Sequence, residues 1–364
     1  MCRDDAVRGK GANQVLRPID KQIVKSWYQH LAEPHIARLS GRILRTTGPR
    51  IAVIGNCQSY SVAYAMKLLL PASRVDHFPV NSRARLSIGV LAETLATYDF
   101  IFAHEFPGGF IPGGGLDELR AKLPRIVLIP QISFAAFHPD CIYVGENGSA
   151  PPVFSPLGAY HSALAVFAFR AGLSMEEANA LFDHKVFEAL GYYDFWNEAS
   201  HELISSNKER FDCDLNAELL GWCRRGVFMY SVNHPKPFVL IDVAKLLLSR
   251  AGLQIPDIDV EYYMIDDFVG QTQPIFPVYT PIGVHFGVKG SYTFRITTVR
   301  DPRNTAEYLT LPQFISSCYK KYLACDPAVL CNARVDLWLA NGGLRDRLVS
   351  LARSNLAAGL APVR

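Results

Sequence analysis

The sequence predicts an α/β protein: an open, mostly parallel sheet flanked by helices, with an inserted helical region and a C-terminal extension. Three observations carry this prediction. Short apolar runs such as 51–54 (IAVI) and 100–103 (FIFA) alternate with helical patterns. These runs are continuous, as expected for strands that helices cover on both faces. Polar residues follow directly after the runs, where parallel strands end.

The first half of the chain is predicted to form four strands with helices between them. The strand at 50–55 (RIAVIG) leads into a helical pattern at 59–70, in which Val62, Met66 and Leu69 share one face. Further strands are predicted at 73–80, 99–106 and 125–132, and further helices at 86–98 and 116–123. This alternation is typical of parallel crossover connections.

The second half is predicted to be richer in helices. Two helices that break at Gly172 are expected within 158–182, and Ser174 with Glu177 has the pattern of a capping box. A strand, a loop and a helix return at 226–253. Proline-rich loops follow, and after them we predict a strand at 291–299 and helices at 311–324 and 333–352.

These patterns divide the chain into three parts. Residues 1–47 form an N-terminal extension with a helical pattern. Residues 48–253 form the α/β core, which carries a helical insertion at about 155–225. Residues 254–364 form a loop-rich and helical extension that we expect to pack on the core.

The composition describes a folded protein without a dominant charge. Of its 364 residues 49% are hydrophobic and 20% charged, and the net charge is +3. No run of five like charges occurs, which argues against a nucleic-acid-binding surface but permits a locally basic pocket. The N-terminal residues are polar, and no apolar run reaches the roughly 18 residues of a membrane span. We therefore expect a cytoplasmic protein without a transmembrane segment.

The eight cysteines do not suggest a metal site. They form no CxxC pair, and the closest group, Cys318, Cys325 and Cys331, lacks the spacing of zinc ligands. We expect reduced and mostly buried thiols and no bound metal.

Polar residues at the carboxyl ends of the strands are the first candidates for a site. In open parallel sheets, ligands bind outside these ends. The candidates for substrate or oxyanion binding are Gly55, Asn56, Gln58, His104, Gln131 and, further along the chain, Asn233.

Cys57 is the candidate nucleophile because it lies between a predicted strand and a predicted helix. A helix N-terminus offers unpaired N–H groups and a partial positive charge, which favour a reactive thiolate. The same N–H groups, with Gln58, are suited to hold an oxyanion. The alternative is that Cys57 is a small buried residue that fills a tight turn.

His234 is the candidate general base. Asn233 is predicted to cap the following helix, and Pro235 and Pro237 suit its first turn. A helix N-terminus disfavours the imidazolium and keeps the histidine neutral and basic. His138 and Asp140 are candidates to orient His234 or to bind substrate. The alternatives are a histidine that bonds the backbone near the cap and a polar turn at 138–140.

Three motifs in order carry a resemblance to a known family. They are GNCQ at 55–58, FAAFHPD at 134–140 and NHP at 233–235. Together they resemble the WcbI-type polysaccharide biosynthesis proteins, over about residues 48–250. The resemblance implies an SGNH hydrolase-like core that binds coenzyme A. It places Cys57 where SGNH enzymes carry their serine, and His234 at their late histidine. Position 231 is Ser, so the Asp-x-x-His pattern of those enzymes is absent.

The resemblance implies an O-acetyltransferase that uses acetyl-coenzyme A as co-substrate and acts on a sugar or polysaccharide precursor. Two mechanisms fit: a thioester on Cys57, or direct attack by a hydroxyl that His234 deprotonates. Two other functions remain open, an SGNH-like esterase or deacetylase of glycans and a non-catalytic glycan-assembly or coenzyme A-binding protein. The candidate cations for the phosphates of coenzyme A are Arg83, Arg85, Arg170 and Lys236.

Overall fold

The structure is a computed structural model that describes residues 47–80, 87–145, 153–264, 274–296 and 307–359. The chain divides into two compact units. The first comprises residues up to Ala63 and Leu70–Val127, and the second comprises Tyr64–Leu69 and Leu128–Arg364. This division falls inside the predicted core of residues 48–253.

The first unit contains the parallel sheet that the sequence predicts. Its strands are β1 (Arg50–Gly55), β2 (Arg74–Pro79), β3 (Phe100–Ala103) and β4 (Val127–Leu128), in the spatial order β2-β1-β3-β4. Strand β1 pairs in parallel with both β2 and β3. Its residues from Ile51 to Ile54 are completely buried, which explains why that run is apolar throughout.

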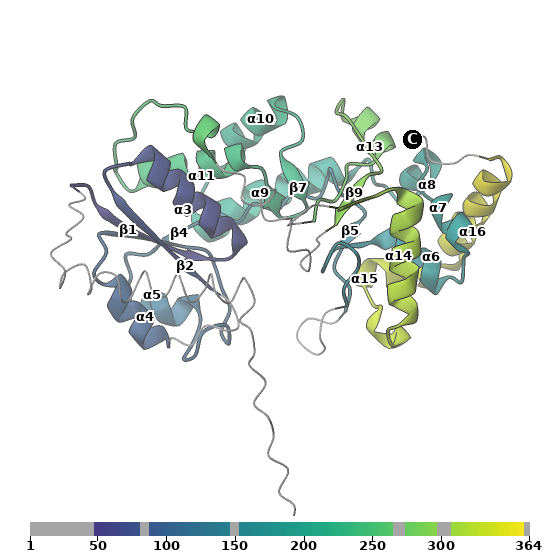
Figure 1. Ribbon diagram of the computed structural model, residues 1–364, viewed down its shortest axis with the longest axis horizontal. Helices are drawn as coiled ribbons and strands as arrows, with labels where there is room; N and C mark the ends of the chain where they lie inside the picture. The colour runs from purple at the N-terminus through teal and green to yellow at the C-terminus, as the bar shows by residue number, and fades with distance from the viewer. Residues whose placement is uncertain (1–46, 81–86, 146–152, 265–273, 297–306, 360–364) are drawn as a thin grey trace, which may run out of the picture. The chain divides into compact units, whose positions relative to one another are not determined.

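Helices cover both faces of this sheet. Helix α3 (Cys57–Leu69) follows β1 directly and lies on one face, whereas α4 (Ile88–Leu95) and α5 (Leu116–Lys122) lie side by side on the other (Figure 1). Helix α4 begins at Ser87, whose hydroxyl accepts a hydrogen bond from Val90 N. The open α/β architecture with helices on both faces is therefore confirmed.

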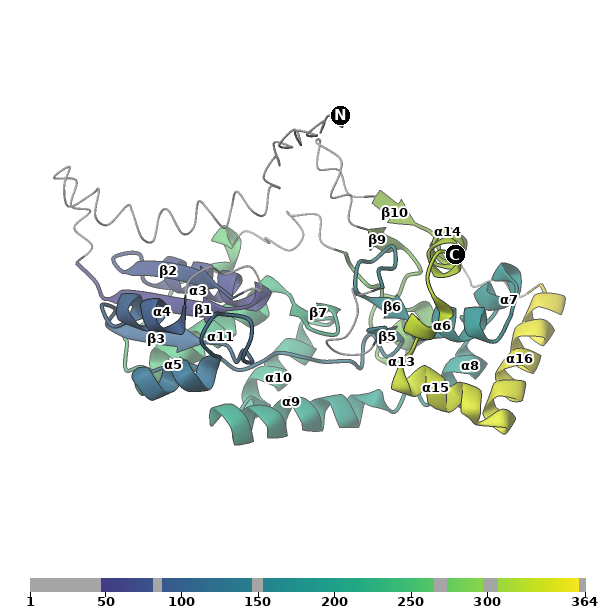
Figure 2. The same ribbon diagram turned by 90° about the horizontal axis from the view of Figure 1, so that it is seen from below.

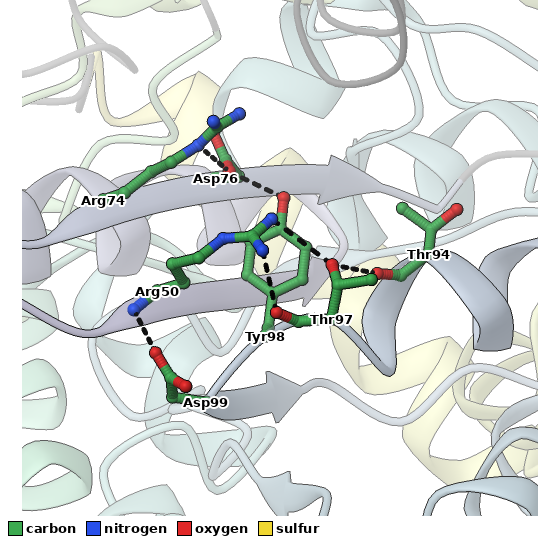
Figure 3. A network of polar contacts seen from close by, with 7 residues as sticks. All are labelled: Arg50, Arg74, Asp76, Thr94, Thr97, Tyr98 and Asp99. Carbon is green, nitrogen blue, oxygen red and sulfur yellow. Dashed lines mark hydrogen bonds and ion pairs between the residues drawn. The ribbon is translucent and has the colours of Figure 1, made fainter. Parts of the chain in front are cut away.

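A polar network fixes the amino ends of these strands (Figure 3). The Arg50 amide donates to the carboxylate of Asp99 at 2.7 Å. On the neighbouring strand, Asp76 accepts from the guanidinium of Arg74 and from the hydroxyl of Tyr98, at 2.7 and 2.6 Å. These charged groups therefore form their hydrogen bonds at the end of the sheet opposite to the turn that contains Cys57.

The second unit is mainly helical, with three short antiparallel pairs. The pairs are β5 (Cys141–Ile142) with β6 (His161–Ser162), β7 (Met229–Ser231) with β8 (His234–Pro235), and β9 (Phe294–Ile296) with β10 (Glu307–Leu309). Its helices before residue 251 are α6 (Ala163–Arg170), α7 (Met175–Asn179), α8 (His184–Ala189), α9 (Phe195–Phe211), α10 (Asn216–Arg224) and α11 (Pro237–Arg250). Those after it are η1 (Glu261–Tyr263), α13 (Thr280–His285), α14 (Leu311–Leu323), η2 (Pro327–Val329), α15 (Ala333–Ala340) and α16 (Gly342–Ala357).

The core of the second unit is built around α6. Its residues from Ala163 to Ala168 are completely buried, and α7, α14 and α15 pack against it (Figure 2). Aromatic rings close the core beside them: Phe294 and Phe314 stack with their ring centroids 3.9 Å apart. Residues after 253 thus contribute to the same core as residues of the predicted insertion.

Several predicted elements differ in extent from those observed. The strand predicted at 125–132 is regular only at Val127–Leu128. The helix predicted at 333–352 is two helices, because Asn341 ends α15 and its side chain accepts from Leu344 N to begin α16. The capping box of Ser174 and Glu177 is confirmed at the start of α7. The predicted N-terminal helical pattern lies outside the described residues.

Candidate functional site

The turn after β1 requires glycine at position 55. Gly55 has a φ of 153°, in a region that residues with a side chain rarely adopt. A Cβ atom at this position would lie 2.8 Å from both Cβ and Nδ1 of His104. The backbone of the turn therefore packs directly on the histidine that follows β3.

Asn56 and Ser59 hold the first turn of α3. The Asn56 side-chain oxygen accepts from Gln58 N at 3.0 Å, and the Asn56 carbonyl accepts from the Ser59 hydroxyl at 2.6 Å. The Ser59 oxygen also lies 2.8 Å from Nε2 of His77, on β2. Because the only hydroxyl hydrogen of Ser59 goes to Asn56, His77 donates to Ser59. A side chain of the neighbouring strand thus supports the Cys57 turn.

Cys57 is exposed at the first position of α3, as predicted for a reactive group, but its thiol is not a favoured thiolate. Desolvation by the surrounding protein raises the pKa of Cys57, and the opposing effect of the N–H groups of Cys57 and Gln58 is smaller. The N–H groups at the helix start thus act on the pKa in the expected direction, but desolvation outweighs them, and the thiol is protonated at neutral pH. The alternative of a residue that fills the turn stays open, because protein surrounds the thiol although the residue is exposed.

His104 and Gln58 are buried beneath this turn. His104 is 2% exposed, and among the described residues neither of its ring nitrogens has a hydrogen-bond partner. Burial lowers the pKa of His104 to about 3, so the ring is neutral. Gln58 is 5% exposed. The first unit therefore brings together four predicted residues around Cys57: Gly55, Asn56, Gln58 and His104.

His234 lies in the β7–β8 hairpin of the second unit, and not at the helix start that was predicted. Helix α11 begins at Pro237, its N-cap residue is Lys236, and Asn233 therefore does not cap it. Pro235 restricts His234 to an extended conformation, and the two residues pair with β7. Burial lowers the pKa of His234 to about 4. The imidazole is neutral as expected, but the cause is desolvation.

Three polar side chains surround the δ-nitrogen side of His234. The Tyr160 hydroxyl lies 2.6 Å from Nδ1 and 2.6 Å from the side-chain oxygen of Asn233. The Ser231 hydroxyl lies 3.0 Å from the same Nδ1. Asn233 in turn donates through Nδ2 to the hydroxyl of Tyr143 at 2.9 Å. Tyr143, Tyr160, Ser231, Asn233 and His234 form what we call the His234 cluster.

Asp140 and His138 are also buried in the second unit. The Asp140 carboxylate accepts from Leu164 N, Tyr192 Oη and Tyr279 Oη at 2.9, 2.8 and 2.7 Å. Desolvation raises its pKa, and the donors that surround it act in the opposite direction. These contacts explain the buried carboxylate without a ligand. Nε2 of His138 lies 3.5 Å from the Met229 carbonyl, and burial lowers its pKa to about 4.

The remaining predicted residues have different environments. Arg170 forms an ion pair with Asp336 on α15. Gln131 has an exposed side chain, and the side chain of buried Asn207 bonds its backbone N and O at 2.9 and 3.0 Å. The Lys236 ammonium lies 5.7 Å from the ring centroid of Tyr230. The predicted candidates Arg83 and Arg85 lie outside the described residues.

The residues around these groups that were not predicted include Ser59, His77, Tyr160 and Asn207. Ser59 follows Cys57 by two positions, so the helical pattern itself placed it near the turn. The other three come from distant positions in the chain, and no local pattern distinguishes them. Within the described residues no group of three potential metal ligands occurs, and no helix there is long and apolar enough to cross a membrane.

Comparison with known proteins gives a family and a fold. Residues 50–256, more than half of the chain, match the family model described as polysaccharide biosynthesis enzyme WcbI. A solved structure is similar with a TM-score of 0.57 and 15% identity, over 84% of this chain and 99% of that one. That protein is described as WcbI, a novel polysaccharide biosynthesis enzyme, in its native form without a disulfide bond between coenzyme A and one of its cysteines. Comparison with curated proteins gives no match.

Proposed function

Because the chain belongs to the WcbI family of polysaccharide biosynthesis enzymes, we propose that it transfers an acetyl group from acetyl-coenzyme A to a hydroxyl of a sugar or polysaccharide precursor. The observation that carries the proposal is the exposed thiol of Cys57 at the carboxyl end of β1. The solved relative is described by reference to coenzyme A and a cysteine.

The choice of Cys57 among the cysteines follows from exposure. The matched region 50–256 contains four cysteines, and the structure describes all of them. Cys141 and Cys213 are buried and Cys223 is partly buried, whereas Cys57 is exposed. We therefore infer that Cys57 is the cysteine that lies beside the thiol end of coenzyme A.

In the proposed reaction, Nε2 of His234 takes the proton of the acceptor hydroxyl as its oxygen attacks the thioester carbonyl. The C–S bond then breaks, and the imidazolium returns the proton to the leaving thiolate of coenzyme A. The pKa of about 4 leaves the His234 ring neutral and able to accept a proton at physiological pH. In the first unit, the N–H groups of Cys57 and Gln58, which lower the pKa of the thiol, are suited to stabilise an oxyanion.

The protonation of Cys57 favours direct transfer over a covalent intermediate. A thiol with a raised pKa must first lose its proton to attack a thioester. Direct attack by the acceptor needs no such step. We therefore propose that Cys57 shapes the acyl site without carrying the acyl group.

Lys236 is the cation that we propose for a phosphate of coenzyme A. It is the N-cap residue of α11, where the partial positive charge of a helix N-terminus adds to that of the ammonium. Arg170 is less suited because Asp336 already neutralises it.

Coenzyme A binding is the first test. We expect coenzyme A to raise the melting temperature of the wild-type protein, since a ligand of the native state stabilises it. Lys236→Met should weaken binding by about tenfold, in line with the loss of one charged contact. Lys245→Met, on the same helix, is the matched control and should bind normally. A protein that hydrolyses acetylated glycans but does not bind coenzyme A would establish the esterase instead.

Transfer itself is tested with acetyl-coenzyme A and a panel of sugar acceptors. His234→Ala should lower turnover by about 100- to 1,000-fold. Cys57→Ala should keep measurable turnover, and rapid-quench mass spectrometry of the wild type should find no acetylated enzyme. An acetyl group on Cys57 that forms and decays at the rate of turnover would replace direct transfer by the covalent route. Normal turnover in both variants would refute the assignment of both residues.

A further inference from the structure

We propose that Tyr160, Ser231 and Asn233 are positioning residues that replace the usual orienting carboxylate, and that they hold His234 with its proton on Nδ1 and its lone pair on Nε2. The geometry of the His234 cluster carries this inference. Only its kinetic consequence rests on the proposed function, because the position of the proton is a property of the protein alone.

The hydrogen bonds of Asn233 determine the direction of the others. Its Nδ2 group donates to Tyr143, so its Oδ1 atom faces Tyr160 as an acceptor. An amide oxygen carries no hydrogen, and the Tyr160 hydroxyl therefore gives its only hydrogen to Asn233. Burial raises the pKa of Tyr160 far above the physiological range, so that hydrogen is always present.

The proton of His234 follows from this direction. The Tyr160 oxygen lies 2.6 Å from Nδ1, and having donated elsewhere it acts as an acceptor toward the ring. Nδ1 therefore carries the hydrogen, and in the neutral ring Nε2 carries the lone pair. The Ser231 oxygen, 3.0 Å from Nδ1, is a second acceptor for the same hydrogen. The basic nitrogen is thus the one on the opposite side of the ring from the cluster.

Ser231 occupies the position that an aspartate would hold three residues before the histidine. Its side chain is completely buried and within hydrogen-bond distance of Nδ1. A serine can accept the Nδ1 hydrogen but brings no negative charge to stabilise an imidazolium. The titratable neighbours named in the cluster, Tyr143 and Tyr160, are phenols, and burial lowers the pKa of His234. The cluster fixes the orientation of the ring and leaves it uncharged.

The proton is located by NMR on protein labelled with ¹⁵N in histidine, with His234→Gln to assign the signals. We expect the wild type to show the neutral form protonated on Nδ1. Tyr160→Phe should shift the ratio of the two neutral forms by at least about tenfold towards protonation on Nε2, because the phenol oxygen is lost. Tyr262→Phe, at an exposed position of the same unit, is the matched control and should leave the ratio unchanged. A wild-type ring protonated on Nε2 would overturn the inference.

A second variant tests the effect of the uncharged side chain at position 231 on the pKa of His234. Ser231→Asp should raise the pKa of His234 by about one to three units in the same NMR titration, since a carboxylate this close stabilises the imidazolium. Ser231→Ala should not raise it. An unchanged pKa in a folded Ser231→Asp protein, with a normal circular dichroism spectrum, would show that position 231 does not face the ring.

Measurements of kcat and KM distinguish this inference from the proposed function. If His234 is the base, Tyr160→Phe should lower kcat by about tenfold or more with little change in KM, because a misoriented base weakens the chemical step. The expected NMR result without any transferase activity would leave the inference standing and refute the function. If the ratio of the two neutral forms of His234 in Tyr160→Phe equals that of the wild type, the inference is refuted, whatever the activity.

Discussion

The hydroxyl of Ser59 lies 2.8 Å from Nε2 of His77 and donates to the carbonyl of Asn56 at 2.6 Å, so strand β2 supports the turn that presents Cys57. Ser59→Ala removes both contacts at a completely buried position. We expect it to lower the free energy of unfolding by about 1–3 kcal/mol, because the partly buried His77 loses its hydrogen bond to Ser59. Urea denaturation measures the change.

Ser61→Ala is the control for this variant. Ser61 lies two residues further along α3 and is only partly buried. Because alanine favours a helix slightly more than serine does, this control should change stability by no more than about 0.5 kcal/mol. Equal effects of the two substitutions would show that the Ser59 contacts do not support the turn.

Gly55→Ala adds a single methyl group, and we expect it to be among the most destabilising additions of this kind in the first unit. The new Cβ atom would lie 2.8 Å from His104, and the residue would keep a φ of 153°. The backbone penalty and the overlap together should lower the free energy of unfolding by about 2–4 kcal/mol. Thermal and urea unfolding both measure this loss of stability.

Gly89→Ala is the matched control, within helix α4. The atom nearest to the added methyl group would be the hydroxyl oxygen of Ser87, at an ordinary 3.7 Å. Alanine in a helix is favoured over glycine, so stability should rise by up to about 1 kcal/mol. A Gly55→Ala protein as stable as the wild type would mean that the turn relaxes away from His104.

The buried histidines should make the protein lose stability as the pH falls below neutral. Burial lowers the pKa of four of them to about 3 or about 4: His104, His138, His161 and His234. In the unfolded chain a histidine titrates near pH 6.5, so the unfolded state binds protons first. The stabilisation is complete above about pH 6.5 and is lost as the pH falls towards 4.

Urea unfolding at a series of pH values measures this effect. Each of the four histidines contributes a slope of up to about 1.4 kcal/mol per pH unit within that interval. A single substitution such as His161→Gln should remove one of these contributions, whatever it does to stability at neutral pH. A stability that is constant between about pH 7 and about pH 5 would contradict the assignment of neutral, buried rings.

The side chain of Asn207 holds the segment that follows β4, so replacing it should destabilise the second unit. Its side chain makes two hydrogen bonds to the backbone of Gln131, and it is 1% exposed. Asn207→Leu should lower the free energy of unfolding by about 2–3 kcal/mol, because two backbone groups lose their partner. Asn197→Leu, at an exposed position of the same helix, should change stability by less than about 0.5 kcal/mol.

The fold could be predicted where the signal is local. The run at β1 is buried on both faces, and its apolar pattern alone indicated both ends of the strand. The segment at 125–132 is equally apolar, but only Val127–Leu128 pairs with a neighbour. An apolar run indicates that a segment is buried. A buried segment that does not pair with a neighbouring strand is equally apolar, so the sequence pattern does not distinguish it from a strand.

The site could be predicted in part for a similar reason. The position of Cys57 at a strand-to-helix turn follows from the local pattern, and the structure confirms it. The sign of its pKa shift depends on desolvation by surrounding residues, which no spacing records. At His234 the prolines suggested a helix start, but Pro235 extends the chain before Pro237 begins α11. Partners such as Tyr160, 74 residues away, require the fold itself.

The carboxylate of Asp140 has a consequence for the order in which the second unit forms. Its donors lie 24, 52 and 139 residues further along the chain, and the last of them is Tyr279. Until Tyr279 is in place, the buried carboxyl group of Asp140 lacks one of its hydrogen bonds, and closing so long a loop is slow. A fragment truncated after residue 256, where the family match ends, would never gain it. The shared family region therefore ends before one of the residues that donates a hydrogen bond to Asp140.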